Sequence, residues 1–473
     1  MKEKGSKKAH FIGIAGVGMG STALLLRDSG WEITGSDVGF YPPMSTHLKD
    51  AGINFKEGYS KENIPKDADL IVMGKQAKLS PDTNEEARAA IDSGIEIKSF
   101  AQVLGKLTKN TKNIVVTGSY AKSTCTALLA HCLINAGKDP SYFIGAVPLG
   151  IEKTAKLGDG NVFVLEGDEY PSAHNDDRAK FLHYNTRDVL LTSASHDHIN
   201  VFPTLEDYLK PFKELLESLP KESKKIICFD NSEAKGLAQN YEGVTSYGLN
   251  EGVWSAKDIL YGEASTFALT KNGESIALLE TTLLGAHNIQ NIVGVSAILL
   301  EKELITPGEL AEGVRTFKGV NRRLNLLTPK SSIPVYEGFG SSFEKARAGF
   351  EAMKVHFPKR KIVTVFEPHT FSLRNKGKIT GYDYVFDGVD EVLVYKPAEQ
   401  GAATHAQLTL EEIVERASAN HKNVRGFEKP EKIIKTLEEG LSGDEVIILM
   451  TSGDLDGLIE EIPKLVTKKH QRR

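Results

Sequence analysis

The chain has 473 residues, too many for one hydrophobic core, and at ~150 residues per domain this length suggests about three domains. Charged residues make up 26% and hydrophobic residues 40% of the sequence, as in ordinary soluble proteins, and no segment has the ~18 apolar residues of a membrane span. The formal net charge of −5 gives no support for nucleic acid or an acidic membrane surface as a partner.

The cysteines and the N-terminus indicate the compartment. Three cysteines without metal-ligand spacing predict a reduced, cytoplasmic protein, and we expect Cys125 and Cys132, on one expected helix, to pack rather than react. The apolar N-terminal run resembles a signal peptide. Its glycines and the charged Arg27-Asp28 that follow at once favour folded structure instead.

Residues 1–108 are expected to form a first α/β domain. A strand at 10–15 leads into the glycine-rich segment 13–18, and a helix and a second strand follow, ending at Asp37. The acid lies roughly 20 residues beyond the glycines, where an acid commonly meets a ribose. On this pattern alone, a dinucleotide, a UDP-sugar and no ligand stay open as alternatives. Two further strands are expected at 70–73 and 96–99.

The segment 114–124, Ile-Val-Val-Thr-Gly-Ser-Tyr-Ala-Lys-Ser-Thr, opens a second domain, expected at 109–325. A β-branched strand, a small-residue turn and a helix form the arrangement that wraps nucleotide phosphates, with Lys122 neutralising the anion and Ser123 able to hold Mg²⁺. Ala121 stands where the usual loop has glycine, at a position where φ is often positive and a Cβ is unfavourable. The alternative is a plain strand–turn–helix corner.

Polar side chains follow two expected strands of this second domain. The strand at 161–165 ends in Glu166-Gly-Asp168-Glu169, and the strand at 188–192 ends near Asp197-His198. Carboxyl ends of strands are where ligands bind in open α/β sheets. Taken singly, these residues fit a solvated acidic loop and a turn histidine. Together with Lys122 and Ser123 they offer ligands for one or two Mg²⁺ ions.

Two further polar groups lie later in the chain. His287, Asn288 and Asn291 form one patch of an expected helix, for which capping and an exposed face are alternatives to ligand binding. Arg322 and Arg323 precede the third domain and could reach a phosphate between lobes, or could be plain surface arginines.

Residues 326–473 are expected to form a third parallel α/β domain, because strands alternate with helical stretches. The expected strands lie at 333–336, 361–366, 389–394 and 444–450. The expected helices lie at 344–355, 410–419 and 431–437.

Several motifs together resemble those of the Mur ligases, the ATP-dependent amide-forming enzymes of cell-wall precursor synthesis. The motifs are Gly-Ile-Ala-Gly-Val-Gly-Met-Gly at 13–20, Tyr-Pro-Pro-Met-Ser-Thr at 41–46, Glu-Gly-Asp-Glu-Tyr at 166–170, D-x-R-x-K-F-x-H-Y from Asp176 to Tyr184, Gly-Ala-His-Asn-Ile-Gln-Asn at 285–291 and Gly-Val-Asn-Arg-Arg at 319–323. The second and fourth of these motifs are typical of the members that recycle murein peptides.

This resemblance implies a Rossmann-like N-terminal domain for the UDP moiety, a central P-loop ATPase-type domain and a C-terminal Rossmann-like ligase domain. It implies ATP and Mg²⁺, and as substrates UDP-N-acetylmuramate and the peptide L-alanyl-γ-D-glutamyl-meso-diaminopimelate, joined through an acyl phosphate in peptidoglycan recycling. We expect a monomer or weak dimer without a nucleic-acid partner.

The resemblance also assigns residue roles. The catalytic residues would be Lys122, Glu166 and His198, and the metal ligands Ser123, Glu166 and His198. Nucleotide binding would fall to Gly118, Ser119, Tyr120, Ala121, Lys122, Ser123, Thr124, His287, Asn288, Asn291, Arg322 and Arg323. UDP-sugar binding would fall to Gly16, Gly18, Met19, Ser36 and Asp37.

Several positions depart from the family pattern. Ala121 replaces a loop glycine, Ser193 and Ser195 replace an Asn and a Glu, and Pro171 replaces an Asp. The segment 336–343 lacks an acid and two histidines, and Thr-Ser-Gly-Asp-Leu-Asp-Gly at 451–457 replaces a Ser-Asn-Gly-Gly-Phe-Gly-Gly motif. Losing one preorganised polar group costs on the order of 10²–10³ in rate. Several such losses would leave a non-catalytic homologue that binds only nucleotide or UDP-sugar, which is one alternative. The others are a UDP-N-acetylmuramate–L-alanine ligase and an oxidoreductase that uses the glycine-rich segment and Asp37.

Overall fold

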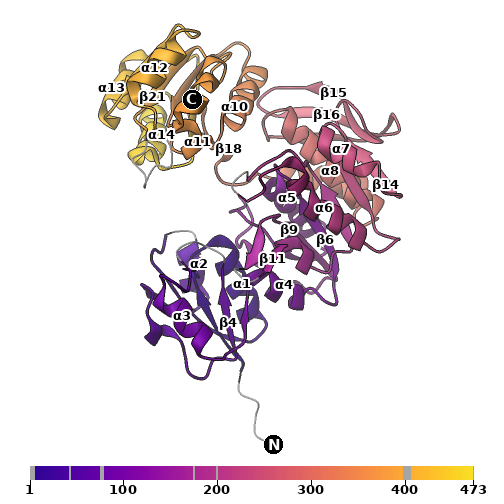
Figure 1. Ribbon diagram of the computed structural model, residues 1–473. Coiled ribbons are helices and arrows are strands. Elements are labelled where there is room, and N and C mark those ends of the chain that lie inside the picture. Colours follow the sequence, from indigo (N-terminus) through magenta and orange to yellow (C-terminus); the bar gives the residue numbers. More distant parts are fainter. Residues whose placement is uncertain are drawn as a thin grey trace, which may run out of the picture. The chain divides into compact units, whose positions relative to one another are not determined.

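The computed structural model describes residues 6–41, 44–74, 79–173, 176–198, 201–397 and 406–471 (Figure 1). Pro42 and Pro43, which belong to the predicted Tyr-Pro-Pro-Met-Ser-Thr motif, lie outside these ranges. The chain packs as two compact units: residues 1–258, 267–280 and 290–317 form the first, and residues 259–266, 281–289 and 318–473 form the second. Within the described ranges, no helix is both long and apolar enough to cross a bilayer.

The first unit begins with a parallel five-stranded sheet of order β3-β2-β1-β4-β5. Its strands are β1 (Lys8–Ile12), β2 (Glu32–Asp37), β3 (Asn54–Glu57), β4 (Leu70–Met73) and β5 (Ile97–Lys98). The accompanying helices are α1 (Val17–Asp28), α2 (Met44–Asp50), η1 (Lys61–Asn63), α3 (Glu85–Asp92) and α4 (Phe100–Leu107). The strand order reverses direction at β1, and ligands of open α/β sheets bind beside such a reversal.

A ten-stranded sheet follows in the order β17-β16-β15-β14-β13-β12-β6-β9-β7-β8. Its strands are β6 (Lys112–Thr117), β7 (Ser141–Phe143), β8 (Ala155–Lys156), β9 (Val162–Gly167), β12 (Asp188–Leu191), β13 (Lys225–Cys228), β14 (Val244–Tyr247), β15 (Trp254–Leu260), β16 (Ser265–Lys271) and β17 (Glu274–Thr281). Strand β6 pairs in parallel with β12 on one side and β9 on the other, so the three carboxyl ends share one edge.

Helices and a hairpin accompany this sheet. They are α5 (Lys122–Asn135), the antiparallel pair β10 (Pro171–Ala173) and β11 (Asp176–Ala179), η3 (Lys180–His183), α6 (Leu205–Ser218), α7 (Ser232–Ala238), α8 (Ala286–Glu301) and α9 (Pro307–Thr316).

The second unit contains a six-stranded sheet of order β18-β19-β23-β20-β21-β22, parallel except for β18. The strands are β18 (Arg323–Leu326), β19 (Val335–Phe339), β20 (Lys361–Phe366), β21 (Glu391–Tyr395), β22 (Val424–Phe427) and β23 (Glu445–Thr451). The helices are α10 (Phe343–His356), α11 (Phe371–Arg374), η4 (Lys376–Asp383), α12 (Leu410–Ser418), α13 (Pro430–Gly440), η5 (Leu455–Gly457) and α14 (Leu458–Lys469).

Both faces of this last sheet are covered. On β20, Ile362 and Phe366 belong to one buried cluster, whereas Val363 and Val365 belong to another. Successive strand residues point to opposite faces, so an unbroken apolar run is what a sheet with helices on both sides requires. The predicted α/β class is thereby confirmed, and the predicted strands 70–73 and 361–366 coincide with β4 and β20.

Two element boundaries differ from the sequence prediction. Helix α1 begins at Val17, so Gly18, Met19 and Gly20 lie in its first turn rather than in a loop. These glycines allow close packing, since a Cβ on Gly20 would lie 2.3 Å from Met44 Sδ and 2.9 Å from the Ile14 carbonyl oxygen. Strand β9 runs to Gly167 and therefore includes Glu166, which the prediction placed after the strand.

All three cysteines are free and buried. Burial raises the pKa of Cys132 to about 12 and that of Cys228 to about 11, so both thiols stay protonated at neutral pH. The expectation of packing rather than reactivity for Cys125 and Cys132 agrees with this burial.

Candidate functional site

The turn between β6 and α5 carries the predicted phosphate loop. Ala121, immediately before the helix, has φ +64° and ψ −1°, in the left-handed region. Gly118 has φ +138°, and a Cβ there would lie 2.4 Å from Thr192 Oγ1 and 2.6 Å from the Ser193 carbonyl oxygen. Ala121 thus adopts the positive φ for which the family uses glycine, at a cost of about 1–2 kcal/mol.

The loop is attached to the segment after β12. The Ser119 and Tyr120 N–H groups donate to the Ser193 carbonyl oxygen (3.2 Å) and Ser193 Oγ (3.0 Å), respectively. Thr192 Oγ1 donates to the Tyr120 carbonyl oxygen at 2.6 Å, and Ser119 Oγ donates to the Ser195 carbonyl oxygen at 2.5 Å. The two serines that depart from the family pattern therefore support the loop.

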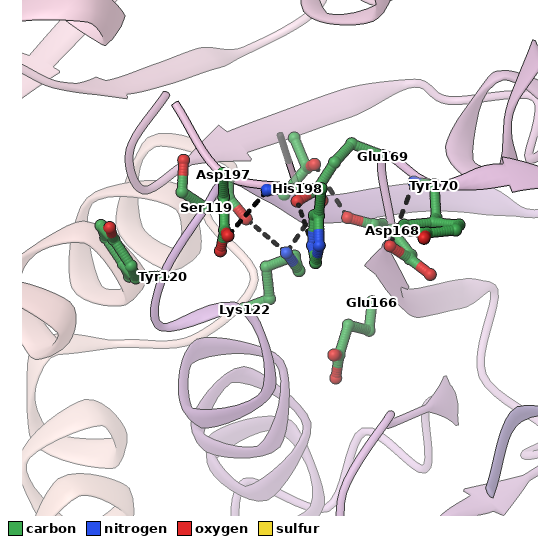
Figure 2. Close-up of polar contacts among 12 residues, drawn as sticks. Ser119, Tyr120, Lys122, Glu166, Asp168, Glu169, Tyr170, Asp197 and His198 are labelled. Atoms are coloured by element: carbon green, nitrogen blue, oxygen red, sulfur yellow. Dashed lines mark hydrogen bonds and ion pairs between the residues drawn. The ribbon is translucent and has the colours of Figure 1, made fainter. Parts of the chain in front are cut away.

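Lys122 lies at the first position of α5, with 15% of its side chain exposed. Its ammonium donates to the Gly118 carbonyl oxygen (2.6 Å) and to Glu169 Oε2 (2.8 Å), and Figure 2 shows Lys122 and Glu169 with His198 beside them. Burial opposes the charge of Lys122, but the carboxylates of Glu169, Asp168 and Glu166 outweigh it and hold its pKa above the ordinary value. The lysine is therefore a cation at neutral pH.

Ser123 and Glu166 meet beside this lysine. Ser123 Oγ donates to Glu166 Oε1 at 2.8 Å, and the Gly145 N–H donates to Glu166 Oε2 at 2.7 Å. A Cβ on Gly145 would lie 2.5 Å from Glu166 Oε1, so glycine is needed for this approach. Burial raises the pKa of Glu166 above its ordinary value, against the opposing effect of these donors and of Lys122.

His198 approaches the same loop from the end of β12. Its Nε2 lies 3.6 Å from Glu169 Oε1, and its ring packs edge-on against Tyr170 (5.1 Å between centroids). The backbone N–H of His198 donates to Asp197 Oδ1 at 2.8 Å. Within the described ranges, no three His, Cys, Asp or Glu side chains form a metal cluster. The residues still fit Mg²⁺, which usually keeps several waters and takes one or two protein ligands plus substrate phosphates.

Asp168 and Asp176 organise the neighbouring hairpin. Asp168 forms an ion pair with Lys180, and Lys180 Nζ lies 5.4 Å from the Tyr170 ring centroid. Burial acts against the charge of Asp168, but Lys180 and Lys122 hold its pKa below the ordinary value.

Two further residues of the D-x-R-x-K-F-x-H-Y motif, Arg178 and His183, contact Asp176. Arg178 contacts both Asp176 oxygens (2.9 and 2.8 Å), His183 Nε2 lies 3.1 Å from Oδ2, and Gln102 Nε2 of α4 donates to Oδ2 at 3.2 Å. The Arg178 guanidinium lowers the pKa of Asp176 to about 2. Lys180 of the same motif contacts Asp168 instead, one of the carboxylates at the end of β9.

The predicted patch at the start of α8 divides between the two units. His287, which is exposed, and Asn288 belong to the second unit, and Asn291 belongs to the first. Asn288 Nδ2 donates to the Leu284 carbonyl oxygen at 2.8 Å, which is a local backbone contact of the kind the alternative interpretation proposed.

The paired arginines contact their own unit. Arg322 Nε lies 3.0 Å from Glu337 Oε1, and Arg322 Nη2 donates to the Gly453 carbonyl oxygen. The guanidinium carbons of Arg322 and Arg323 lie 5.4 and 5.0 Å from the centroid of the Phe339 ring. Glu337 thus supplies a carboxylate within the segment 336–343 that departs from the family pattern.

In the N-terminal sheet, Asp37 holds the glycine-rich loop. Its Oδ2 accepts the Ala15 N–H (2.9 Å), and its Oδ1 accepts the Val38 N–H (2.8 Å) and the Tyr59 hydroxyl (3.2 Å). Ser36 is fully buried and donates to Glu86 at 2.6 Å.

The other predicted UDP-sugar residues lie where this loop meets α1. Gly16 caps the helix and Met19 is buried. All five predicted residues are therefore beside the first β-turn-α junction.

Sequence reasoning missed two residues that contact this site. Tyr208 of α6 reaches both Ser119 and Glu169, and Gly145 donates its N–H to Glu166. Neither residue lies in a recognisable motif. A tyrosine in an amphipathic helix usually indicates core packing, so the sequence offered no reason to place Tyr208 at the site. The three-dimensional structure places Tyr208 against the loop residue Ser119 and Gly145 against Glu166.

A cationic lysine, a serine hydroxyl and a buried carboxylate thus gather at the start of a helix whose first N–H groups have no intrahelical acceptor. Such an arrangement can bind a nucleotide phosphate with its metal ion. The fold and the site together define a multidomain α/β protein with a candidate phosphate-binding loop between β6 and α5.

Comparison with known proteins identifies the family. The profile described as "Mur ligase family, catalytic domain" matches residues 8–112, and the profile described as "Mur ligase middle domain" matches residues 116–299. Together these two profiles cover more than half of the chain. The chain belongs to the Mur ligase family, whose members are ATP-dependent ligases that form amide bonds.

Individual relatives extend over nearly the whole chain. The chain is 28% identical to a UDP-N-acetylmuramate–L-alanine ligase of Clostridium acetobutylicum (96% of this chain, 97% of the relative). It is also 28% identical to the UDP-N-acetylmuramate–L-alanyl-γ-D-glutamyl-meso-2,6-diaminoheptandioate ligase of Escherichia coli (98% and 99%). The crystal structure of the alanine ligase of Thermotoga maritima shares the fold with a TM-score of 0.79, 22% identity and coverage of 98% and 99%.

Replacing Ala121 with glycine is expected to stabilise the protein. Relief of the left-handed alanine outweighs the greater flexibility of glycine in the unfolded chain, so we expect a gain of about 0.5–1 kcal/mol, measured by thermal unfolding. Ala127→Gly, inside α5, is the matched control and should lose about 1 kcal/mol or more. A loss of stability in Ala121→Gly would contradict the left-handed turn.

Asp176→Asn is expected to lose stability in a pH-dependent way. Because the pKa of Asp176 is lowered in the folded state, its carboxylate stabilises the fold above pH ~4, and this contribution disappears as pH falls toward about 2. Urea unfolding should show wild type about 2 kcal/mol more stable at pH 7, with the gap closing below pH 4. The exposed Asp159→Asn control should show no such gap, and a pH-independent gap for Asp176→Asn would refute the assignment.

Proposed function

We propose that this chain uses ATP to activate the carboxyl group of UDP-N-acetylmuramate and joins it to the amine of L-alanyl-γ-D-glutamyl-meso-diaminopimelate, in peptidoglycan recycling. The observation that carries the proposal is the contact of Ser123 with Glu166 at 2.8 Å beside Lys122. Similarity to the E. coli ligase over 98% of the chain supports the choice of substrates. ATP and UDP-sugars are cytoplasmic metabolites, so we place the activity there, in a monomer or weak dimer.

In the proposed reaction a carboxylate oxygen attacks the γ-phosphorus of ATP, and the bond from that phosphorus to ADP breaks. The peptide amine then attacks the carbonyl carbon of the acyl phosphate, inorganic phosphate leaves, and the amine loses a proton. Two anions must meet in the first step, so positive charge and positioning supply most of the rate. In the second step the amine must reach the carbonyl while water is kept away.

The chain's own residues meet these needs as follows. Lys122 neutralises the terminal phosphates, and the N–H groups at the start of α5 donate to them. Ser123, Glu166 and His198 would hold Mg²⁺, which supplies further positive charge when bound. Asp37 keeps the glycine-rich loop of the first sheet in place for the UDP moiety.

A second candidate function is ligation of free L-alanine. The Clostridium acetobutylicum relative, named as a UDP-N-acetylmuramate–L-alanine ligase, is as similar to the chain as the E. coli relative. The motifs at 41–46 and 176–184 favour the peptide instead. A binding-only protein is the third possibility, favoured by the strained Ala121 and by the altered segment 336–343.

Phosphate release separates these functions. With ATP, Mg²⁺ and UDP-N-acetylmuramate, we expect phosphate and the amide product, identified by mass, when the tripeptide is present and little of either with L-alanine. Lys122→Ala should lower the rate by about 10²-fold or more, because it removes a preorganised charge from the phosphate. Lys156→Ala, which removes a surface lysine paired with Asp139, is the control and should keep full activity.

The remaining outcomes each reject part of the proposal. Turnover with L-alanine alone would replace the peptide by the amino acid as substrate. Saturable UDP-sugar or ATP binding without turnover for any amine would leave a binding protein.

Gly145→Ala should weaken the response to Mg²⁺. The added Cβ would displace the Glu166 carboxylate, so we expect a higher Mg²⁺ concentration for half-maximal phosphate release, by about tenfold. Gly236→Ala, a helical glycine with open space around its Cβ position, is the matched control and should leave the Mg²⁺ response unchanged. An unchanged response in Gly145→Ala would show that Glu166 does not hold the metal.

A further inference from the structure

Glu169 is a fully buried carboxylate that contacts three functional groups. Lys122 Nζ lies 2.8 Å from Oε2, while the Tyr208 hydroxyl (3.0 Å) and His198 Nε2 (3.6 Å) approach Oε1. None of its side chain is exposed. A carboxylate in such surroundings is stabilised only by these partners, so its hold on Lys122 depends on what the other two contribute.

Tyr208 connects this carboxylate to the phosphate loop. It is fully buried in α6, and its hydroxyl lies 3.0 Å from both Ser119 Oγ and Glu169 Oε1. Its ring packs edge-on against Phe202 and Phe212, which fixes the direction of the hydroxyl. A hydroxyl has one proton, and Glu169 can only accept while ionised, so Tyr208 is the donor in the contact with Glu169.

The arrangement controls how much positive charge Lys122 offers to a phosphate. An ammonium has three donors, and two are used by the Gly118 carbonyl oxygen and Glu169. The Glu169 charge also cancels part of the lysine's attraction for an anion. A hydrogen-bond donor to Glu169 stabilises part of its negative charge, so Glu169 then cancels less of the attraction of Lys122 for an anion.

We propose that Glu169 and Tyr208 are positioning residues for Lys122. Glu169 holds the ammonium in place and offsets part of its positive charge. Tyr208 donates a hydrogen bond to the same carboxylate, which weakens the hold of Glu169 on Lys122 and so strengthens the attraction of Lys122 for the terminal phosphates of the nucleotide. This inference rests on the proposed nucleotide site, because it concerns phosphates bound at Lys122. It adds two residues that neither contact the substrate nor hold the metal.

The two residues should have opposite effects on ATP affinity. Tyr208→Phe keeps the packed ring but removes the donor, so Glu169 holds Lys122 more strongly and the Kd for ATP rises about tenfold, as expected for one hydrogen bond to a charged group. Glu169→Gln removes the restraining charge, so the Kd for ATP falls. Its rate of phosphate release falls as well, because the ammonium is less well fixed.

The chain offers a matched control for the tyrosine. Tyr184 is also fully buried in this unit, and its hydroxyl has no hydrogen-bond partner among the described residues. Tyr184→Phe therefore removes the same atom without removing a hydrogen bond, and its Kd for ATP should equal that of wild type. AMP is the ligand control, since Lys122 reaches only the β- and γ-phosphates, and neither Tyr208→Phe nor Glu169→Gln should change its affinity.

Calorimetric titration with ATP and AMP, without and with Mg²⁺, measures these constants, and thermal unfolding checks that each variant is folded. Equal losses of ATP and AMP affinity, or shifts of the same sign in the two variants, would reduce Tyr208 and Glu169 to structural roles and overturn the inference. Unchanged variants beside a wild type that binds ATP would overturn only this inference. A wild type without ATP binding would overturn the proposed function as well.

Discussion

The central site depends on the hydrogen bonds and ion pairs that stabilise three carboxylates within four residues. Glu166, Asp168 and Glu169 follow one another at the end of β9, where the strand pairing leaves them next to the start of α5. The groups in direct contact with them differ: Ser123 and the Gly145 N–H contact Glu166, Lys180 contacts Asp168, and Lys122 and Tyr208 contact Glu169. Glu169 is the one of the three whose side chain is fully buried, and left unpaired it would cost several kcal/mol, so Lys122 stabilises the fold before any phosphate binds.

The phosphate loop combines one strained position with several hydrogen bonds to the segment 192–195, two of them through the side chains of Thr192 and Ser193. Ala121 has the left-handed backbone conformation that a glycine adopts freely. Thr192, Ser193 and Ser195, which follow β12, form hydrogen bonds with Ser119 and Tyr120 of the loop. Strain of this kind persists only where the surroundings fix the conformation. The serines that differ from the family pattern are therefore part of the structure that maintains the turn.

The sequence predicted the fold class and strands in each of the three large sheets, because apolar runs, glycines and alternating helices follow local rules. It did not predict β13 to β17, which make up half of the ten-stranded sheet, or the edge strands β3 and β22. It also predicted that Lys122, Ser123, Glu166 and His198 lie near one another, since strand ends of a parallel sheet share an edge. It could not predict that Asp37 accepts the Ala15 N–H or that Ser36 donates to Glu86, because a polar residue at the end of a strand has the same sequence pattern whether it faces solvent or a buried partner. Tyr208 was missed for a related reason, since its hydroxyl acts across a distance of 89 residues in the chain. The domain boundaries at 108/109 and 325/326 stay predictions.

The burial of every cysteine gives the protein a practical property. Thiol-directed dyes react with exposed thiolates, and none of Cys125, Cys132 and Cys228 meets that condition in the folded state. A cysteine engineered on the surface of each compact unit would thus react selectively with a fluorophore, and the three native cysteines would not have to be replaced first. Energy transfer between two such labels could then follow the separation of the units during turnover, in single molecules and with the natural core intact.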